Sequence, residues 1–172
     1  MHYNERTIIE GLVYHFNNYY RLHQSLNPIV KDKYTDQARS QNWITINSMR
    51  HELTAYLNRM GQFYFYAKSD SVTDLGISYE IEMPEILRFI PLRHKLTAHR
   101  AFDNPRKNEE INQIKITDSH FHGGAYMLIN GRFIVQLKHK NDVISFDLIK
   151  EHSKIISEAK KLLDLIEDKK QI

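Results

Sequence analysis

The stretch INSMRHELTAYLNRMGQF, residues 46–63, decides the fold. Its apolar residues alternate steps of three and four positions, which is the spacing of one continuous seam along a long helix. These residues are Ile46, Met49, Leu53, Tyr56, Met60 and Phe63. The seam predicts a helix over about 38–67 that packs lengthwise against other helices.

Two other segments share this helical period. Residues 5–26 carry apolar side chains at helical spacing, between Asn4, which can cap a helix, and Asn27-Pro28, which can end it. Residues 148–166 follow Asp147, whose carboxylate is a good N-cap, and their apolar positions again alternate steps of four and three. Each segment therefore predicts a helix with an apolar face.

The segment after the central helix predicts a loop and then a third helix. Residues 69–79, SDSVTDLGISY, are loop-like. Pro84 suits the first turn of a helix, because its missing N–H would have no partner there, and helical spacing continues to about Phe102. Within that helix Pro91 removes a backbone hydrogen bond and can kink the axis just before Arg93.

The period changes after residue 105. Residues 125–129 and 132–138 are rich in β-branched and aromatic side chains and flank Asn130-Gly131, a strong signal for a hairpin turn. Residues 143–146 predict a further strand, and residues 111–117 are a candidate for another. The predicted fold class is therefore mainly α: a four-helix bundle in a single domain, 1–172, with a small antiparallel β insertion at about 111–146 before the last helix.

Composition excludes several classes of protein. The chain has 172 residues, of which 41% are hydrophobic and 26% charged, as expected for one globular domain. It has no cysteine, which excludes disulfides, thiolate zinc sites and cysteine nucleophiles. No apolar run approaches the ~20 residues that cross a bilayer, and the first residues, MHYNERTIIE, lack the layout of a secretory signal. We therefore expect a cytoplasmic protein without a membrane partner.

Positive charge is concentrated in one segment, although the net charge of the whole chain is only +3. Between residues 88 and 107 there is one acidic residue, and the six basic residues are Arg88, Arg93, Lys95, Arg100, Arg106 and Lys107. Such a cluster is either an ordinary solvated surface or a surface that binds an anion. The segment is therefore the first candidate for contact with a phosphate.

The third helix carries two apolar strips. At 100° per residue, Ile86 and Ile90 belong to the strip that should face the core, whereas Phe89, Leu92 and Leu96 form a second strip bordered by cations. A second apolar face favours a dimer interface with another copy of the chain. The alternative is burial of this strip under the β insertion.

The segment Arg93-His94-Lys95-Leu96-Thr97-Ala98-His99 resembles the signature of HEPN domains, an arginine followed a few residues later by a histidine. It is most similar to the subgroup R-(N/D)-K-x-x-A-H of abortive-infection and toxin-antitoxin proteins, with Lys95 and Ala98 in matching positions. The resemblance implies an all-helical, dimerising bundle that cleaves RNA without a metal ion or other cofactor. His94 departs from the pattern, and Ala101 stands where toxins silenced by nucleotide addition have a tyrosine.

The chemistry of RNA cleavage suits these residue types. The imidazole of His99 can transfer a proton near neutral pH, and the guanidinium of Arg93 can stabilise extra charge on the phosphate. On a straight helix the two residues lie about 120° apart and ~9 Å along the axis, so we expect fraying near His99 or a site shared across a homodimer. Contact with RNA phosphates is assigned to Arg88, Lys95, Arg100, Arg106 and Lys107.

These patterns predict a metal-independent endoribonuclease of HEPN type that acts on single-stranded RNA in a bacterial defence or toxin-antitoxin system. The alternative is a non-catalytic HEPN-type module that binds RNA, a nucleotide or a protein partner, such as an antitoxin-like protein.

Three other patterns compete with this site. His120-Phe121-His122 places two imidazoles on one side of a strand, as a metal site would, but it has no third ligand nearby and the following glycines favour a loop. Glu52 makes a surface or core contact, or it orients a site residue from a neighbouring helix. The aromatic run at residues 63–66 closes the end of the bundle or stacks on bases.

Overall fold

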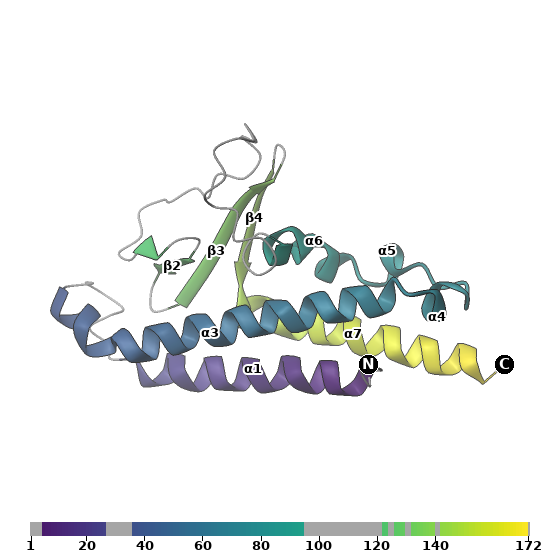
Figure 1. The fold of residues 1–172 in the computed structure, drawn as a ribbon, viewed down its shortest axis with the longest axis horizontal. Helices are drawn as coiled ribbons and strands as arrows, with labels where there is room; N and C mark the ends of the chain where they lie inside the picture. The colour runs from purple at the N-terminus through teal and green to yellow at the C-terminus, as the bar shows by residue number, and fades with distance from the viewer. Residues whose placement is uncertain are drawn as a thin grey trace.

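Figure 1 shows a computed structural model of the chain, in which long helices lie alongside one another and a small sheet rises from one side of them. The structure describes residues 5–26, 36–94, 122–123, 126–129, 132–139 and 142–171, with side chains for residues 5–26, 43–94, 134–136 and 143–171. The three long helices are α1 (Glu5–Ser25), α3 (Asp36–Ala67) and α7 (Leu148–Lys170). The helices expected over 5–26, 38–67 and after residue 147 are thus confirmed.

The core lies where α1, α3 and α7 meet. All six seam residues of α3 are at most 1% exposed. They belong to one buried cluster with Ile8, Leu12 and Tyr19 of α1 and with Ile155, Ala159 and Leu162 of α7. Burial of each large apolar side chain contributes about 1.5–3 kcal/mol, so this seam is the main source of stability.

One polar contact lies inside this core. The hydroxyl of Tyr56 lies 3.1 Å from Nδ1 of His152 on α7. The ring of His152 also stacks on Phe16 of α1, with centroids 3.6 Å apart and planes 2° from parallel. Burial lowers the pKa of His152 to about 4 and raises the pKa of Tyr56. His152 is therefore neutral in the folded protein near neutral pH.

The segment between α3 and α6 is more ordered than the predicted loop. It contains two one-turn helices, α4 (Asp70–Thr73) and α5 (Tyr79–Glu82). Buried Val72 and Ile77 attach this segment to the core. Helices of one turn are too short to show a hydrophobic period, which is why the sequence pattern did not reveal them.

Helix α6 (Pro84–Arg93) packs on α3 and α7, and α7 caps its start. The two carboxylate oxygens of Glu158 accept hydrogen bonds from the backbone N–H groups of Glu85 and Ile86, both at 3.0 Å. These N–H groups belong to the first turn of α6, where no carbonyl of the helix can accept from them. The negative charge of Glu158 also interacts favourably with the positive end of the helix dipole. The start at Pro84 is confirmed, and the expected continuation to Phe102 lies outside the described residues after residue 94.

An antiparallel sheet precedes α7, in the order β1 (His122–Gly123), β2 (Tyr126–Ile129), β3 (Arg132–His139) and β4 (Asp142–Asp147). The predicted hairpin and the strand after it are confirmed as β2, β3 and β4. The loop expected at His122 and Gly123 is wrong, because these residues pair with β2. The candidate strand at 111–117 lies outside the described residues. The cap at the end of β4 is confirmed, since the Asp147 carboxylate accepts from the N–H of Ile149 at 3.1 Å.

The sheet packs against α6. The ring of Phe146 on β4 lies edge-on to the ring of Phe89 on α6, with centroids 4.8 Å apart, and it also contacts Tyr56. The fold is thus mainly helical with a small antiparallel sheet before the last helix, while a regular four-helix arrangement stays a prediction. Within the described ranges, no helix combines the length and apolar character needed to span a bilayer.

We predict that Glu158→Ala lowers the free energy of unfolding by about 1–3 kcal/mol, because it leaves two N–H groups at the start of α6 without their charged acceptor. Urea denaturation measures the loss. Glu158→Gln should lose less, since its amide oxygen can still accept from one N–H. Asp164→Ala, which removes an exposed carboxylate of the same helix, is the matched control. Equal stabilities of the Glu158→Ala and Asp164→Ala proteins would contradict this capping role.

We predict that His152 makes the protein less stable in acid. An unfolded histidine binds a proton near pH 6.5, whereas folded His152 does so only near pH 4. Between these values the unfolded state binds more protons, so the free energy of unfolding falls as the pH falls. His152→Gln removes the titrating group and keeps a polar partner for Tyr56. Its stability relative to wild type should therefore rise as the pH is lowered from 6.5 to 4, and a difference that is independent of pH would be the contrary result.

Candidate functional site

The predicted site residues divide into those the structure describes and those it does not. Arg88, Phe89, Leu92 and Arg93 lie on α6 and are described. The residues outside the described ranges are Lys95, Leu96, His99, Arg100, Arg106 and Lys107, together with His120. The geometry of the candidate site is therefore the geometry around Arg93.

The apolar strip expected at a dimer interface is buried within the chain. Phe89 is 0% exposed and Leu92 is 1% exposed, and Phe89 packs against Phe146 of the sheet. The assignment of Phe89 and Leu92 to an exposed dimer interface is therefore wrong, because both are buried within the chain. For Phe89 the structure shows the alternative, packing against the β insertion. The spacing of apolar residues revealed the second strip but not the element that covers it.

Arg88 points into solvent on a different side of α6 from Arg93. Its side chain is 53% exposed and forms a 3.7 Å ion pair with Glu85. Its guanidinium also lies over the ring of Phe89, 5.2 Å from the centroid. Arg93 follows Arg88 by five positions, which places the two about 140° apart around the helix. They therefore cannot hold one phosphate together on a straight α6.

Arg93 lies flat against α3 at Gly61. A Cβ atom at residue 61 would be 2.5 Å from Nε of Arg93 and 2.9 Å from its Cδ. Such distances are well below van der Waals contact, so the arginine can adopt this position only because residue 61 has no side chain. Gly61 thereby lets α6 and α3 approach closely at the residue that the motif singles out.

The guanidinium of Arg93 ends beside an exposed ring. It lies over Phe65, one turn after Gly61 on α3, with its carbon 5.4 Å from the ring centroid. Nη1 of Arg93 is also 3.5 Å from Nδ1 of the neighbouring His94. The His94 N–H donates to the carbonyl groups of Ile90 and Pro91, so the backbone is still helical there. Arg93 is thus a half-buried cation whose stem lies against Gly61 and whose guanidinium lies over Phe65.

Glu52 contacts a different histidine on the other side of α3. Its Oε2 lies 2.7 Å from Nδ1 of His15 on α1, and its Oε1 accepts a long hydrogen bond from Asn18 at 3.5 Å. Glu52 therefore makes a part-buried polar contact with a neighbouring helix, which is the first of its two alternatives, and the residue that it contacts is not one of the predicted site residues. Glu52 and Gly61 are nine residues apart, about 2.5 turns, so they lie on opposite sides of α3. This pair belongs to the packing of α1 on α3 and not to the site around Arg93.

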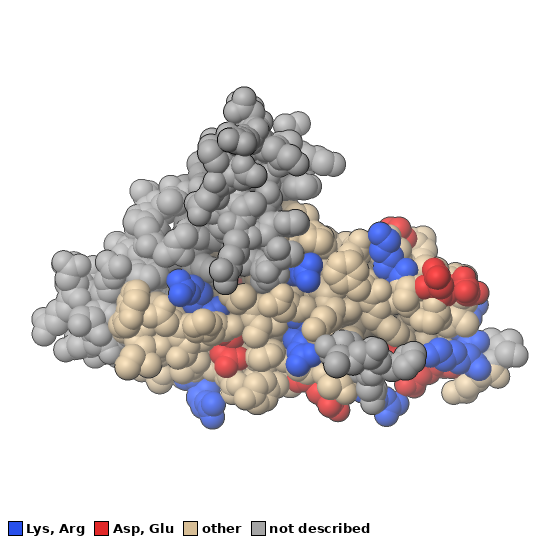
Figure 2. Space-filling view, viewed as in Figure 1, with Lys and Arg blue, Asp and Glu red and all other residues tan. Residues whose placement is uncertain are grey.

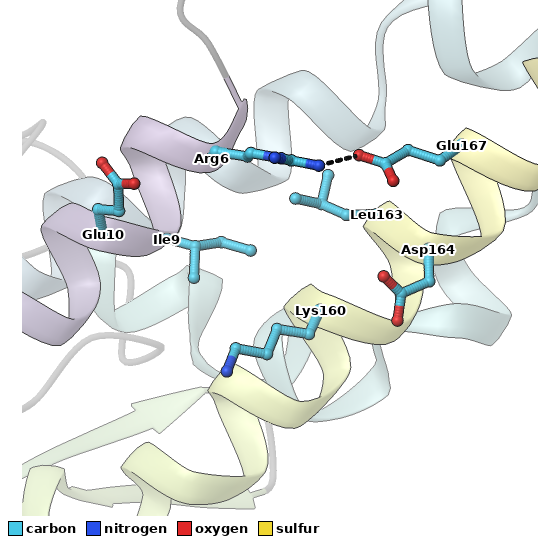
Figure 3. Close-up of a pocket in the computed structure, with 7 residues that line it drawn as sticks. All are labelled: Arg6, Ile9, Glu10, Lys160, Leu163, Asp164 and Glu167. Atoms are coloured by element: carbon cyan, nitrogen blue, oxygen red, sulfur yellow. Dashed lines mark hydrogen bonds and ion pairs between the residues drawn. The ribbon is translucent and has the colours of Figure 1, made fainter.

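The described surface also has a hollow between α1 and α7, with a volume of about 240 Å³. Figure 3 shows that Ile9 and Leu163 face each other across it, while the carboxylate of Glu10 points away. Arg6 spans the gap to Glu167 in a 3.0 Å ion pair. The hollow lacks any residue of α6 or of the motif, so it is separate from the Arg93 site.

Charge is mixed on the face that Figure 2 shows. Lys and Arg are scattered among uncharged residues along the helices, and Asp and Glu lie together with Lys and Arg toward the end with α4 and α5. The α4 and α5 segment carries Asp70, Asp74, Glu80 and Glu82. The carboxylates of this segment disfavour an anion beside it, although Glu82 is paired with Lys161 of α7. Among the described side chains, no group of three or more His, Asp or Glu residues could hold a metal ion.

Two features of this site were not predicted from the sequence. Gly61 had a signal, since a glycine in the interior of a long helix costs about 1 kcal/mol and often marks a close approach of another element. The contact between Phe65 and Arg93 had none, because 28 positions of chain separate them.

Comparison with family models, with curated proteins and with solved structures finds no significant match. The local geometry of Arg93 is therefore the basis for assigning a function.

We predict that Gly61→Ala and Arg93→Ala are coupled. In the wild-type background, the new methyl group displaces Arg93, which offsets the roughly 1 kcal/mol of helix propensity gained. In the Arg93→Ala background the gain should be realised, so the substitution should be more stabilising there by about 1 kcal/mol. Urea denaturation of the four proteins measures this difference.

Gly11 supplies the matched control, because the side chain of Arg59 lies against it in the same manner, with Nε 2.9 Å from a Cβ at residue 11. Gly11→Ala and Arg93→Ala should have additive effects. Additivity of Gly61→Ala and Arg93→Ala would show instead that the Gly61 contact is not made in solution.

Proposed function

We propose that this chain is a HEPN-type endoribonuclease that cleaves RNA without a metal ion. One observation carries the proposal: Arg93, the arginine of the motif, has its stem against Gly61 and its guanidinium over the exposed ring of Phe65. A planar guanidinium held in one place can donate paired hydrogen bonds to the two oxygens of a phosphate. Because its stem is already ordered, less conformational entropy is lost when it binds.

The reaction follows from these groups and a 2′-hydroxyl of the RNA. The 2′-oxygen attacks the adjacent phosphorus, the bond from phosphorus to the 5′-oxygen breaks, and a 2′,3′-cyclic phosphate forms. The proton of the 2′-hydroxyl must leave and the 5′-oxygen must gain one, and His99 is assigned to this transfer. Arg93 stabilises the additional negative charge on the phosphate in the transition state.

The homodimer in this proposal uses a surface other than the buried Phe89 and Leu92. A shared site has a clear signature in mixed dimers. If each site takes Arg93 from one subunit and His99 from the other, a dimer of one Arg93→Ala and one His99→Ala chain contains one intact site. Co-expression of the two inactive variants should then restore about a quarter of wild-type activity, because half of randomly formed dimers are mixed. A mixture as inactive as either variant alone places both residues of a site in one subunit.

A non-catalytic RNA-binding protein is the second candidate. The arrangement of Arg93 and Phe65 favours it, because a cation beside an exposed ring can bind a nucleotide without any proton transfer. The two candidates differ in whether bound RNA is cut.

We predict that the purified protein cleaves labelled single-stranded RNA in the presence of EDTA. Arg93→Ala should lower the rate about 10²- to 10³-fold, the usual effect of removing one donor that stabilises transition-state charge. His99→Ala should also abolish cleavage while the circular dichroism spectrum and oligomeric state remain those of the wild type. Lys154→Ala, which removes one exposed cation of α7, is the control for loss of charge and should cut normally. Cleavage by Arg93→Ala at the wild-type rate would refute the nuclease, and binding without cleavage by the wild type would favour the second candidate.

A further inference from the structure

Phe65 differs from its aromatic neighbours in being exposed. It is the third of four consecutive aromatic residues, and 52% of its surface is exposed, whereas Phe63 is 0% exposed. Tyr64 and Tyr66 are half-buried and pack against the core cluster. Three of the four rings therefore close the end of the bundle, one of the two alternatives that the sequence allowed, and Phe65 is available for another role.

The surroundings of Phe65 are cationic and aromatic. The guanidinium of Arg93 lies over the ring at 5.4 Å, and the ring of Tyr64 lies 5.3 Å from it at an angle of 55°. The ammonium group of Lys68 in turn lies over Tyr64, 6.0 Å from its centroid. An exposed phenyl ring beside a guanidinium suits a ligand that has both a flat apolar face and a negative charge.

We propose that Phe65 stacks on a base of single-stranded RNA at the nucleotide whose phosphate Arg93 binds. This inference rests on the proposed assignment of Arg93 to phosphate. Phe65 and Gly61 are one turn apart on the same face of α3, so the turn that fixes the arginine also presents the ring. One nucleotide carries both a base and a phosphate. The ring of Phe65 and the guanidinium of Arg93, which would contact them, lie 5.4 Å apart.

Stacking on Phe65 determines which class of substrate the site accepts. Bases in a duplex are already stacked on one another and paired, so a protein ring cannot reach their faces. The ring of Phe65 can stack only on unpaired bases in single strands, loops or bulges. Every base has a π face, so the contact tolerates any sequence. Phe65 therefore selects unpaired RNA without selecting a sequence.

The test measures binding of a fluorescent single-stranded RNA by fluorescence anisotropy in the presence of EDTA. The RNA carries 2′-O-methyl groups and therefore cannot be cleaved. Phe65→Ala should weaken binding about tenfold, within the range measured for loss of one stacked base. Phe65→Trp should bind at least as tightly as the wild type. Tyr14→Ala is the matched control, because Tyr14 is an aromatic residue of α1 that is 61% exposed, and it should bind normally.

A second probe separates stacking from support of Arg93. An oligonucleotide of the same length with abasic residues retains its phosphates and offers no base. Phe65→Ala and the wild type should bind this probe equally. If Phe65→Ala loses affinity for both probes to the same extent, the ring only holds Arg93 in place and the proposal is overturned.

The remaining outcomes are equally decisive. Wild-type affinity of Phe65→Ala for the ordinary probe overturns base stacking, and if this variant changes only the oligomeric state, the ring contacts a second copy of the chain. Failure of the wild-type protein to bind the ordinary probe also overturns the proposal that Phe65 stacks on a base. Cleavage that depends on Arg93 but not on Phe65 would remove this inference and leave the nuclease standing. Binding that depends on Phe65 without any cleavage would leave the inference and remove the nuclease.

Discussion

The contact between the side chain of Arg93 and the bare backbone of Gly61 fixes how α6 lies on α3. At its other end α6 is capped by Glu158 of α7, so the short helix is attached to two long helices, one at each terminus. Between these attachments the sheet covers it through the packing of Phe146 on Phe89. The last turn of α6, where the charged motif begins, is therefore held by the packed core even though it lies near the surface.

On both sides of α3 an arginine side chain lies against a glycine, but the surroundings of the two guanidinium groups differ. On one side Arg59 of α3 packs across Gly11 of α1, and its guanidinium donates to Gln62 of α3 itself. On the other side Arg93 lies across Gly61, but its guanidinium ends beside an exposed phenyl ring. An arginine that serves packing alone has no need of an exposed aromatic neighbour. This difference makes the Arg93 side the better candidate for an RNA phosphate.

Hydrophobic spacing predicted the long helices because each buries one continuous stripe, and Asn130-Gly131 predicted the hairpin because few other pairs suit its turn. The same spacing also revealed both apolar strips of α6. It could not show that Phe89 and Leu92 are buried within the chain, since periodicity describes one helix and carries no information on its neighbours. One-turn helices α4 and α5 were missed for lack of a full period. Gly61 and Phe65 acquire their roles only through a tertiary contact with Arg93, which no local pattern of the sequence reports.

The most direct test of this account follows two arginine side chains at once. The Nε–H groups of Arg93 and Arg59 can be observed in a ¹H–¹⁵N spectrum while 2′-O-methylated single-stranded RNA is added in EDTA. Since both stems lie against a glycine, Arg59 is an internal reference for a guanidinium on the other side of α3. We predict that the Arg93 resonance shifts and saturates with the bound fraction while that of Arg59 stays in place. An unchanged Arg93 resonance at saturating RNA, or equal shifts of both, would contradict the assignment of Arg93 to the RNA phosphate.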